Sequence, residues 1–374
     1  MKSNHFRNTI LFSLILFLLL FPLIQRVTKV FKIEPLKGYI KPVERVEFTK
    51  ESFFDDSFQM SMEAYEKRNI GFQPDLVRIN NQLEFDLFNK INAATIVRGQ
   101  ENHFYGQQYI DSYYGSDYLG DEAVYQKTWK LLKVQEVLKT KGVHLCVVVA
   151  SSKSFVHPQY LPVNNELTAK KTNYESYRLN FDSLKINYID FLPFIKNLDD
   201  TSAYSVHPKT GIHWSYYATY FVVDSLRNYM QQITGIPQPE IKLQKLDVTN
   251  RPRNSDKDIE DGLNLLYINT NDTYAYPNVF IDKSIFAPSL RGLVVADSYY
   301  YTVAHHRFDE LFADFNFWFY YNEVYPSEGQ TNAKQLNLKE ELEKRDVIFI
   351  LVNVTKLQSF AWGFIDDCYA LYCD

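Results

Sequence analysis

The stretch Gly292-Leu293-Val294-Val295-Ala296-Asp297-Ser298-Tyr299-Tyr300 decides the fold that this sequence predicts. Its apolar residues run without alternation, which is typical of a strand buried on both faces of a parallel sheet. The run stops at Asp297-Ser298, and the aromatic residues that follow indicate a helix. A serine on such a turn lies beside helix N–H groups that can hold an oxyanion, which suits a nucleophile. The competing interpretation is an ordinary Asp-Ser helix N-cap.

The rest of the chain repeats this alternation of helix and strand. Apolar periodicity and turn residues predict helices over 121–141, 167–184 and 336–344, and strands over 143–150, 187–192 and 346–354. Such an alternation predicts an α/β domain with a mostly parallel sheet and flanking helices.

Composition limits the classes of function. The chain has 374 residues, 46% hydrophobic content and a formal net charge of −5 without a long basic run, so nucleic-acid binding is not expected. Aromatic residues make up 16% of the chain. They form either an aromatic-rich core or, in part, a groove for a sugar polymer, and the stretch 315–321 has the same two interpretations.

The amino terminus carries an apolar run from Ile10 to Ile24, preceded by a short basic segment. Fifteen helical residues span about 22 Å, which is shorter than a hydrocarbon core of about 30 Å. No small-residue cleavage site follows the run, so an uncleaved anchor is preferred to a removed signal peptide. We therefore expect a cytoplasmic stub and membrane anchor over 1–32 and an exported domain over 33–374. Lys and Arg lie on both sides and leave the orientation open.

The three cysteines have different settings. Cys146 lies in an apolar strand and is expected to be buried. Cys368 and Cys373 would be able to form a disulfide in an oxidising compartment, but the sequence leaves this open. No His or Cys stands at metal-ligand spacing around them, and neither a metal nor a cofactor is expected.

A histidine supplies the second half of a possible catalytic site. The segment 207–215 is expected to open a helix, with His213 in its first turn. The positive end of a helix favours a neutral imidazole, which is able to act as a base. His213 and Ser298 can converge at the C-terminal edge of one sheet, where open α/β sheets bind ligands. The chemistry would be attack of the serine on an ester while His213 takes its proton; a structural histidine is the alternative.

The paired motifs Gly211-Ile212-His213-Trp214 and Val295-Ala296-Asp297-Ser298 resemble those of the alginate O-acetyltransferase family. The order of the motifs, histidine first and serine later, matches this family rather than ordinary SGNH esterases. Further similar segments lie at 97–102, 109–115, 147–153 and 157–162, so the resemblance spans roughly 54–354. It implies an SGNH-hydrolase-like, flavodoxin-like α/β domain behind an N-terminal anchor helix. It also implies O-acetylation of a cell-surface or secreted polysaccharide, with Ser298 as nucleophile and His213 as acid/base.

The chain departs from the family at one position. The family has the triad aspartate two residues before the histidine, where this chain has Gly211. Either another group orients His213 or catalysis is weakened, because losing this orientation can cost about 10⁴ in rate. Candidate acids on another loop are Asp258, Glu260 and Asp261, and a backbone carbonyl is a further possibility. Asp297 is not expected to serve, since adjacent residues on a tight turn usually point apart.

Other expectations concern the surroundings of the site and its partners. Lys153, Trp214 and Tyr299 are candidates for substrate binding, although a solvated Lys153 is the simpler interpretation. By resemblance, a membrane-bound O-acyltransferase would deliver the acetyl group to the exported domain. Two other functions stay open: a carbohydrate acetylesterase that uses the same residues, and a non-catalytic polysaccharide-binding or assembly protein, which Gly211 would explain.

Overall fold

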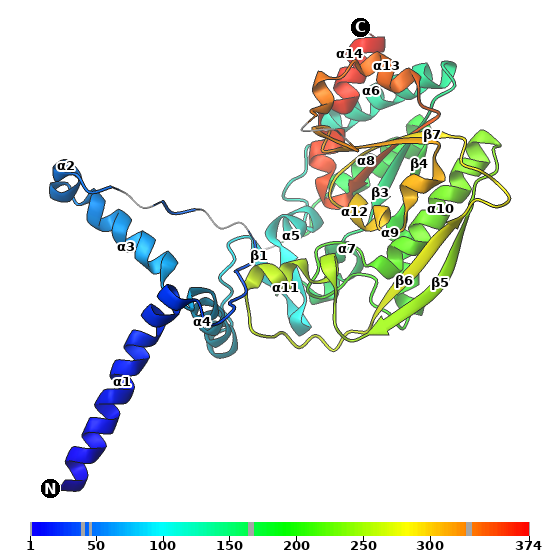
Figure 1. Ribbon diagram of the computed structural model, residues 1–374. Coiled ribbons are helices and arrows are strands. Elements are labelled where there is room, and N and C mark those ends of the chain that lie inside the picture. The colour runs from blue at the N-terminus through cyan, green and yellow to red at the C-terminus, as the bar shows by residue number, and fades with distance from the viewer. Residues whose placement is uncertain (1, 39–41, 45–46, 164–167, 327–330, 374) are drawn as a thin grey trace. The chain divides into compact units, whose positions relative to one another are not determined.

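The computed structural model describes residues 2–38, 42–44, 47–163, 168–326 and 331–373. It divides into two compact units (Figure 1). The first, here the anchor unit, comprises residues 1–94 and 260–268, and the second, here the sheet unit, comprises 95–259 and 269–374. Each unit is described by itself.

The anchor unit is helical where it is described. Its helices are α1 (Lys2–Thr28), α2 (Lys50–Phe54), α3 (Ser57–Asn69) and α4 (Gln73–Phe88). Within the described residues, one helix is long and apolar enough to cross a membrane, with the span His5–Thr28. At 1.5 Å per residue this span measures about 36 Å, so it exceeds the predicted run and can cross a hydrocarbon core.

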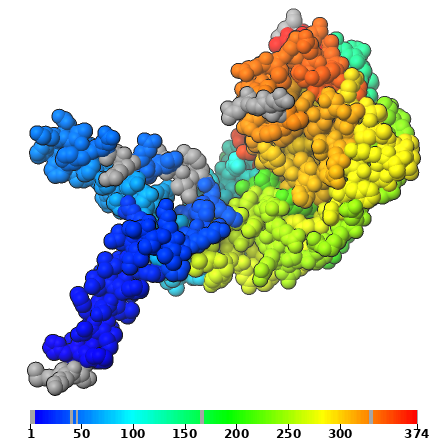
Figure 2. All heavy atoms as spheres, viewed as in Figure 1, coloured from blue at the N-terminus to red at the C-terminus, as the bar shows by residue number. Residues whose placement is uncertain are grey.

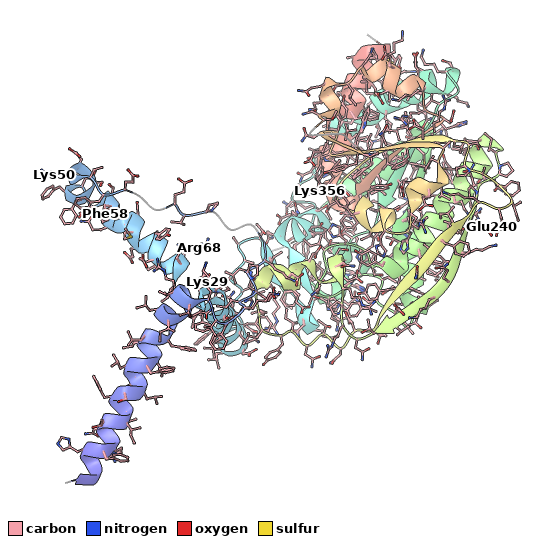
Figure 3. The ribbon with its side chains drawn as sticks, in the orientation of Figure 1. Lys29, Lys50, Phe58, Arg68, Glu240 and Lys356 are labelled. Carbon is pink, nitrogen blue, oxygen red and sulfur yellow. The ribbon has the colours of Figure 1, made fainter. Side chains whose placement is uncertain are left out.

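The surface of α1 fits an anchor. Only 6% of its most apolar segment is buried, and Figure 2 shows most of the helix (dark blue) exposed. Lys29, which Figure 3 labels, follows the helix directly, and Arg26 forms an ion pair with Glu66 of α3. Basic residues therefore mark the end of the apolar span. The predicted N-terminal anchor helix is present as a candidate; its boundary with an exported domain stays a prediction.

The sheet unit contains the central sheet. Its strand order is β4-β3-β10-β7-β8-β9, and all neighbouring pairs are parallel except β8 and β9. The strands are β3 (His144–Ala150), β4 (Tyr188–Asp190), β7 (Arg291–Ala296), β8 (Asp314–Phe319), β9 (Glu323–Tyr325) and β10 (Val347–Asn353). The predicted mostly parallel α/β sheet is confirmed.

Helices cover both faces of this sheet, and every residue of β10 is therefore buried. In one group of helices, α6 (Asp121–Thr140) packs against both α8 (Asn173–Leu184) and α14 (Phe364–Tyr372). In a second group, α10 (Tyr216–Thr234) packs against both α9 (Phe191–Thr201) and α12 (Tyr300–Ala304). The predicted start of α8, Leu167, lies outside the described residues.

Shorter elements complete the two units. Two antiparallel ribbons are β1 (Ile96–Arg98) with β2 (Phe104–Gly106), and β5 (Glu240–Thr249) with β6 (Tyr274–Asp282). The remaining short helices are α5 (Gln107–Tyr113), α7 (Lys153–Val156), α11 (Asp258–Leu263) and α13 (Leu338–Glu343), and the 3-10 segment η6 (Val354–Gly363) follows β10. Cys146, Cys368 and Cys373, which all lie within the described residues, form no disulfide.

Candidate active site

Ser298 stands on the turn between β7 and α12, as its sequence predicts. The preceding Asp297 is buried, and its carboxylate accepts hydrogen bonds from the N–H of Tyr299 (2.9 Å) and of Asn353 (2.8 Å). Asp297 thereby ties the turn to the end of β10, and burial raises the pKa of its carboxyl to about 6. Ser298 itself is partly exposed, so its hydroxyl is accessible from solvent.

The N–H groups of the following helix are already used. Those of Tyr299, Tyr300 and Tyr301 donate to Asp297 Oδ1, the Asp297 carbonyl and the Ser298 carbonyl, respectively. The expectation that the helix N–H groups lie free to hold an oxyanion does not fit this geometry. The hydroxyl of Tyr320 contacts both the side chain and the backbone N–H of Ser298.

His213 lies within hydrogen-bonding distance of Ser298. Its Nε2 is 2.9 Å from Ser298 Oγ, so the two predicted residues meet at the edge of the sheet. Its predicted position in a helix is wrong, since α10 begins only at Tyr216 and Ser215 caps it by accepting from the Ala218 N–H. His213 therefore sits in the loop before the helix, and its hydrogen bonds rather than a helix dipole set its orientation.

Asp258 provides the carboxylate that contacts His213. Its Oδ2 is 2.7 Å from His213 Nδ1, and its Oδ1 accepts the N–H of Ile212 at 2.8 Å. With Nδ1–H donating to this carboxylate, Nε2 is left to accept a proton from Ser298; the tautomer is assigned from these partners. Of the other candidate acids, Asp261 pairs with Lys37 of the anchor unit, to which Glu260 also belongs.

Gly211 explains why the acid comes from another loop. A side chain at this position would start 2.9 Å from the Ser255 carbonyl oxygen and 3.0 Å from that of Asp256. The missing side chain therefore lets the segment 255–258 approach the histidine loop. The N–H of Ile259 donates to the Thr210 carbonyl at 3.0 Å and fixes this approach. The same glycine that removes the family's aspartate thus makes room for Asp258.

Two expected substrate-binding residues are instead part of the packing behind the site. Trp214 and Tyr299 have no exposed surface. The Trp214 indole N–H donates to the Tyr299 carbonyl (3.1 Å), and the Tyr299 hydroxyl donates to the Ile212 carbonyl (2.7 Å). These bonds join the serine turn to the histidine loop, so both side chains position the site rather than offer a surface to a substrate.

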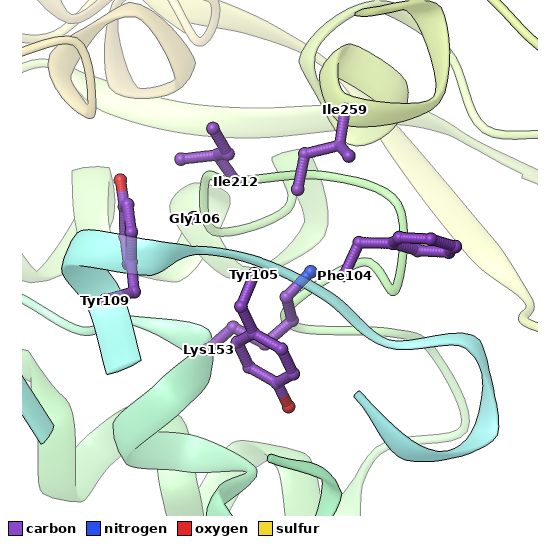
Figure 4. Close-up of a pocket in the computed structure, with 7 residues that line it drawn as sticks. All are labelled: Phe104, Tyr105, Gly106, Tyr109, Lys153, Ile212 and Ile259. Atoms are coloured by element: carbon purple, nitrogen blue, oxygen red, sulfur yellow. The ribbon is translucent and has the colours of Figure 1, made fainter. Parts of the chain in front are cut away.

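Lys153 is also buried, which contradicts the expectation of a solvated lysine. Its side chain lines a small pocket together with Tyr105, Tyr109, Ile212 and Ile259 (Figure 4). Its three N–H groups donate to backbone carbonyls at 2.7–2.8 Å; these belong to Pro208, Lys209 and Gly211. Because its ammonium group is occupied by these carbonyls, Lys153 holds the histidine loop instead of offering a charge to a substrate.

Replacing Lys153 by methionine is expected to lower the free energy of unfolding by about 2–4 kcal/mol, because buried carbonyls lose their donors. The histidine loop should loosen, and the acylation of Ser298 by an activated ester should slow at least about tenfold. Urea unfolding and the rate of this acylation test the prediction. The control is Lys133→Met, which removes a surface ion pair to Glu136 and should change stability by less than about 0.5 kcal/mol. Equal effects in both variants would contradict the assigned role.

Asp256, at the start of the acidic stretch that contains Asp258, lies buried beside this loop. Burial, and secondly the charge of Asp258, raise the pKa of its carboxyl to about 8. The folded state then holds this proton at pH values at which the unfolded chain has lost it. The stabilisation is therefore complete below about pH 4 and is lost as the pH rises through about 8.

Asp256→Asn is expected to remove this pH dependence, because the amide cannot ionise. Between pH 5 and pH 9 the wild type should lose on the order of 1 kcal/mol or more of stability relative to the variant. Thermal or urea unfolding of both proteins at the two pH values gives this difference directly. Parallel pH profiles of the two proteins would show that Asp256 is not protonated in the fold.

Comparison with known proteins agrees with this architecture. Residues 109–256 match a family described as the SGNH hydrolase-like domain of acetyltransferase AlgX. The O-acetyltransferase domain of Pseudomonas putida AlgJ has 13% identity and a TM-score of 0.51, over 74% of this chain and 99% of that chain. Pseudomonas aeruginosa AlgX has 16% identity and a TM-score of 0.46, over 74% of this chain and 68% of that chain. Bacillus cereus PatB1 with a sulfonyl adduct has 9% identity and a TM-score of 0.48, over 74% of this chain and 99% of that chain. No curated protein gives a significant match.

The predicted family resemblance and fold class are therefore confirmed. At 13% identity, the similarity to AlgJ supports the fold alone. The roles of Ser298, His213 and Asp258 stay predictions that rest on their geometry.

Proposed function

We propose that this chain, which carries the SGNH hydrolase-like domain of the acetyltransferase AlgX family, is a serine-dependent O-acetyltransferase that modifies a polysaccharide. The observation that supports this most is the continuous line of hydrogen bonds from Asp258 through His213 to Ser298, at 2.7 and 2.9 Å. A carboxylate, an imidazole and a hydroxyl in this order form the arrangement that activates a serine for acyl transfer.

In the first half-reaction, Ser298 Oγ attacks the carbonyl carbon of the acetyl donor while His213 Nε2 takes the hydroxyl proton. The tetrahedral intermediate collapses, the donor oxygen leaves with the proton from His213, and Ser298 carries the acetyl group. Asp258 stabilises the imidazolium in between. The Tyr320 hydroxyl, which contacts the Ser298 side chain, is the proposed donor to the oxyanion.

In the second half-reaction, a sugar hydroxyl attacks the acetyl carbon and gives its proton to His213. Collapse of this intermediate forms the new ester on the sugar and returns the proton to Ser298. Water in place of the sugar would make the same residues an acetylesterase. A non-catalytic protein was considered because Gly211 stands where an aspartate was expected. This argument weakens because Asp258 contacts His213 instead.

The proposed setting follows from α1 and the family resemblance. With residues 1–32 as cytoplasmic stub and anchor, residues 33–374 would lie outside the cytoplasm, beside the membrane. A membrane-bound O-acyltransferase would supply the acetyl group there. Blocking accessible thiols or lysines from outside intact cells would test this placement, because the sheet unit should react and a cytoplasmic marker should not.

Transfer and hydrolysis are separated by their products. The purified chain is incubated with 4-nitrophenyl acetate and a β-linked hexasaccharide, and acetylated oligosaccharide and free acetate are both quantified. The proposal expects the acetylated sugar to exceed acetate and to disappear in Ser298→Ala. Acetate as the sole product, independent of the sugar, would favour the acetylesterase.

A further inference from the structure

Five partly exposed aromatic side chains gather beside Ser298, and we call them the aromatic surface: Tyr301, Phe319, Tyr320, Tyr325 and Trp362. They come from α12, the end of β8, the turn after it, β9 and η6. Tyr301 is 46% exposed and Tyr325 41%, and the other three are partly buried. By contrast, Phe317 and Trp318 in the same stretch are buried and belong to the core. The stretch 315–321 thus contains both core residues and partly exposed rings.

The rings of this surface form a continuous series. Tyr301 lies 5.3 Å from Phe319, Phe319 lies 4.4 Å from Tyr320, and Tyr320 lies 5.2 Å from Trp362, measured between ring centroids. At the other end, the hydroxyls of Tyr301 and Tyr325 interact, and Tyr325 donates to Glu323 at 2.6 Å. The result is a row of apolar rings with hydroxyl and carboxylate groups at its margin.

This series passes beside the proposed nucleophile. The N–H of Tyr301 donates to the Ser298 carbonyl at 3.2 Å, and the N–H of Tyr320 donates to the Ala296 carbonyl at 2.8 Å. The Tyr320 hydroxyl contacts Ser298 itself. A molecule lying along the rings would therefore pass close to the serine hydroxyl.

Strained backbone holds two of the rings in place. Tyr320 and Tyr321 have φ values of 50° and 53°, and Ala361 and Trp362 have values of 55° and 52°. Each such residue costs about 1 kcal/mol or more and persists where the surrounding structure enforces it, often at functional sites. Here both strained turns present a ring, and these two rings, Tyr320 and Trp362, pack edge-on against each other.

We propose that the aromatic surface binds the acceptor glycan and directs one of its hydroxyl groups to Ser298; this rests on the proposed function. The C–H faces of pyranose rings pack on aromatic rings, while tyrosine hydroxyls and the Glu323 carboxylate bond sugar hydroxyls. A chain of sugar units fits a row of rings better than a single small acyl acceptor does, because each ring offers a further contact.

The test uses the full chain and the double variant Tyr301→Ala/Tyr325→Ala. The matched control is Tyr125→Ala, since Tyr125 is 42% exposed but lies on α6. Two hexasaccharides serve as probes, a neutral β-linked glucose hexamer and a uronic acid hexamer. The double variant should raise the KM for the probe that the wild type uses about tenfold or more, with a smaller change in kcat, because two ring contacts are lost. The fall in the double variant's rate of transfer to the hexamer should also exceed any fall in the rate at which 4-nitrophenyl acetate acetylates its Ser298.

Binding is measured separately from transfer, so that the two proposals can fail independently. Titration of Ser298→Ala with each hexamer, followed by tryptophan fluorescence, reports on the surface without any chemistry. The same titration is made with the triple variant Ser298→Ala/Tyr301→Ala/Tyr325→Ala. Weaker hexamer binding by this variant than by Ser298→Ala supports glycan binding at the aromatic surface even if no transfer occurs. Binding of neither hexamer to Ser298→Ala, or equal binding with and without Tyr301 and Tyr325, overturns it.

Discussion

Replacing Asp258 by asparagine is expected to lower the rate of acetyl transfer about 10⁴-fold, by analogy with the loss of the orienting acid in serine proteases. The amide would offer the imidazole either its NH₂ group or its oxygen, and it cannot stabilise an imidazolium. The proton on His213 would then shift toward Nε2, where it can no longer accept from Ser298. Single-turnover kinetics with 4-nitrophenyl acetate measure the effect on the first half-reaction.

The variant Gly211→Asp tests whether Asp258 or an aspartate at position 211 can orient His213. If the family's aspartate were simply missing, this substitution would restore activity to Asp258→Asn. The structure predicts the opposite, because a side chain at 211 meets the carbonyls of Ser255 and Asp256 at 2.9 and 3.0 Å. Gly211→Asp should therefore displace the segment that carries Asp258 and lower activity even on its own. Wild-type activity of Asp258→Asn, or its rescue by Gly211→Asp, would contradict the assignment of Asp258.

Ser298→Ala is expected to lower transfer by a factor on the order of 10⁴ to 10⁶, because no other group in the arrangement can carry the acetyl group. Stability should change little, since Ser298 is partly exposed and the turn is held by Asp297. Transfer to the hexasaccharide and the free energy of unfolding are measured together.

The matched control for this variant is Ser225→Ala. Its hydroxyl donates to the Phe221 carbonyl on α10, away from the serine turn, and it should keep wild-type transfer. Comparable transfer by Ser298→Ala and Ser225→Ala would remove Ser298 from the mechanism while leaving the fold intact.

The elements that the sequence predicted well are those whose burial follows from local pattern. The unbroken apolar run before Asp297 became β7 (Arg291–Ala296), and the amphipathic stretch after Asp121 became α6. The stretch 37–59 contains Gly38, Pro42 and the Asp55-Asp56 pair, which favour an extended tether, yet α2 begins at Lys50. A capping box between Thr49 and Ser52 starts this helix, and its serine at the third helical position is a weaker signal than the usual Glu or Gln.

The site was predictable only in part, for a physical reason. Ser298 and His213 follow from strand and loop positions, so their convergence could be expected. The choice of Asp258 over Glu260 and Asp261 depends on how closely two loops approach at Gly211, which is a matter of packing between distant segments. The burial of Lys153 depends on three carbonyls from another loop, and a lysine in sequence gives no sign of them.

We propose that Ser298 accepts an acetyl group with the help of His213 and Asp258 and passes it to a sugar. Peptide mass spectrometry after brief exposure to 4-nitrophenyl acetate measures the acetylation of Ser298. We expect a mass increase of about 42 Da on the peptide that contains Ser298. This label should form far more slowly in Asp258→Asn and disappear when the hexasaccharide is added. A folded wild-type chain whose Ser298 stays unlabelled, or whose label changes neither in Asp258→Asn nor on addition of the sugar, would rule out this mechanism.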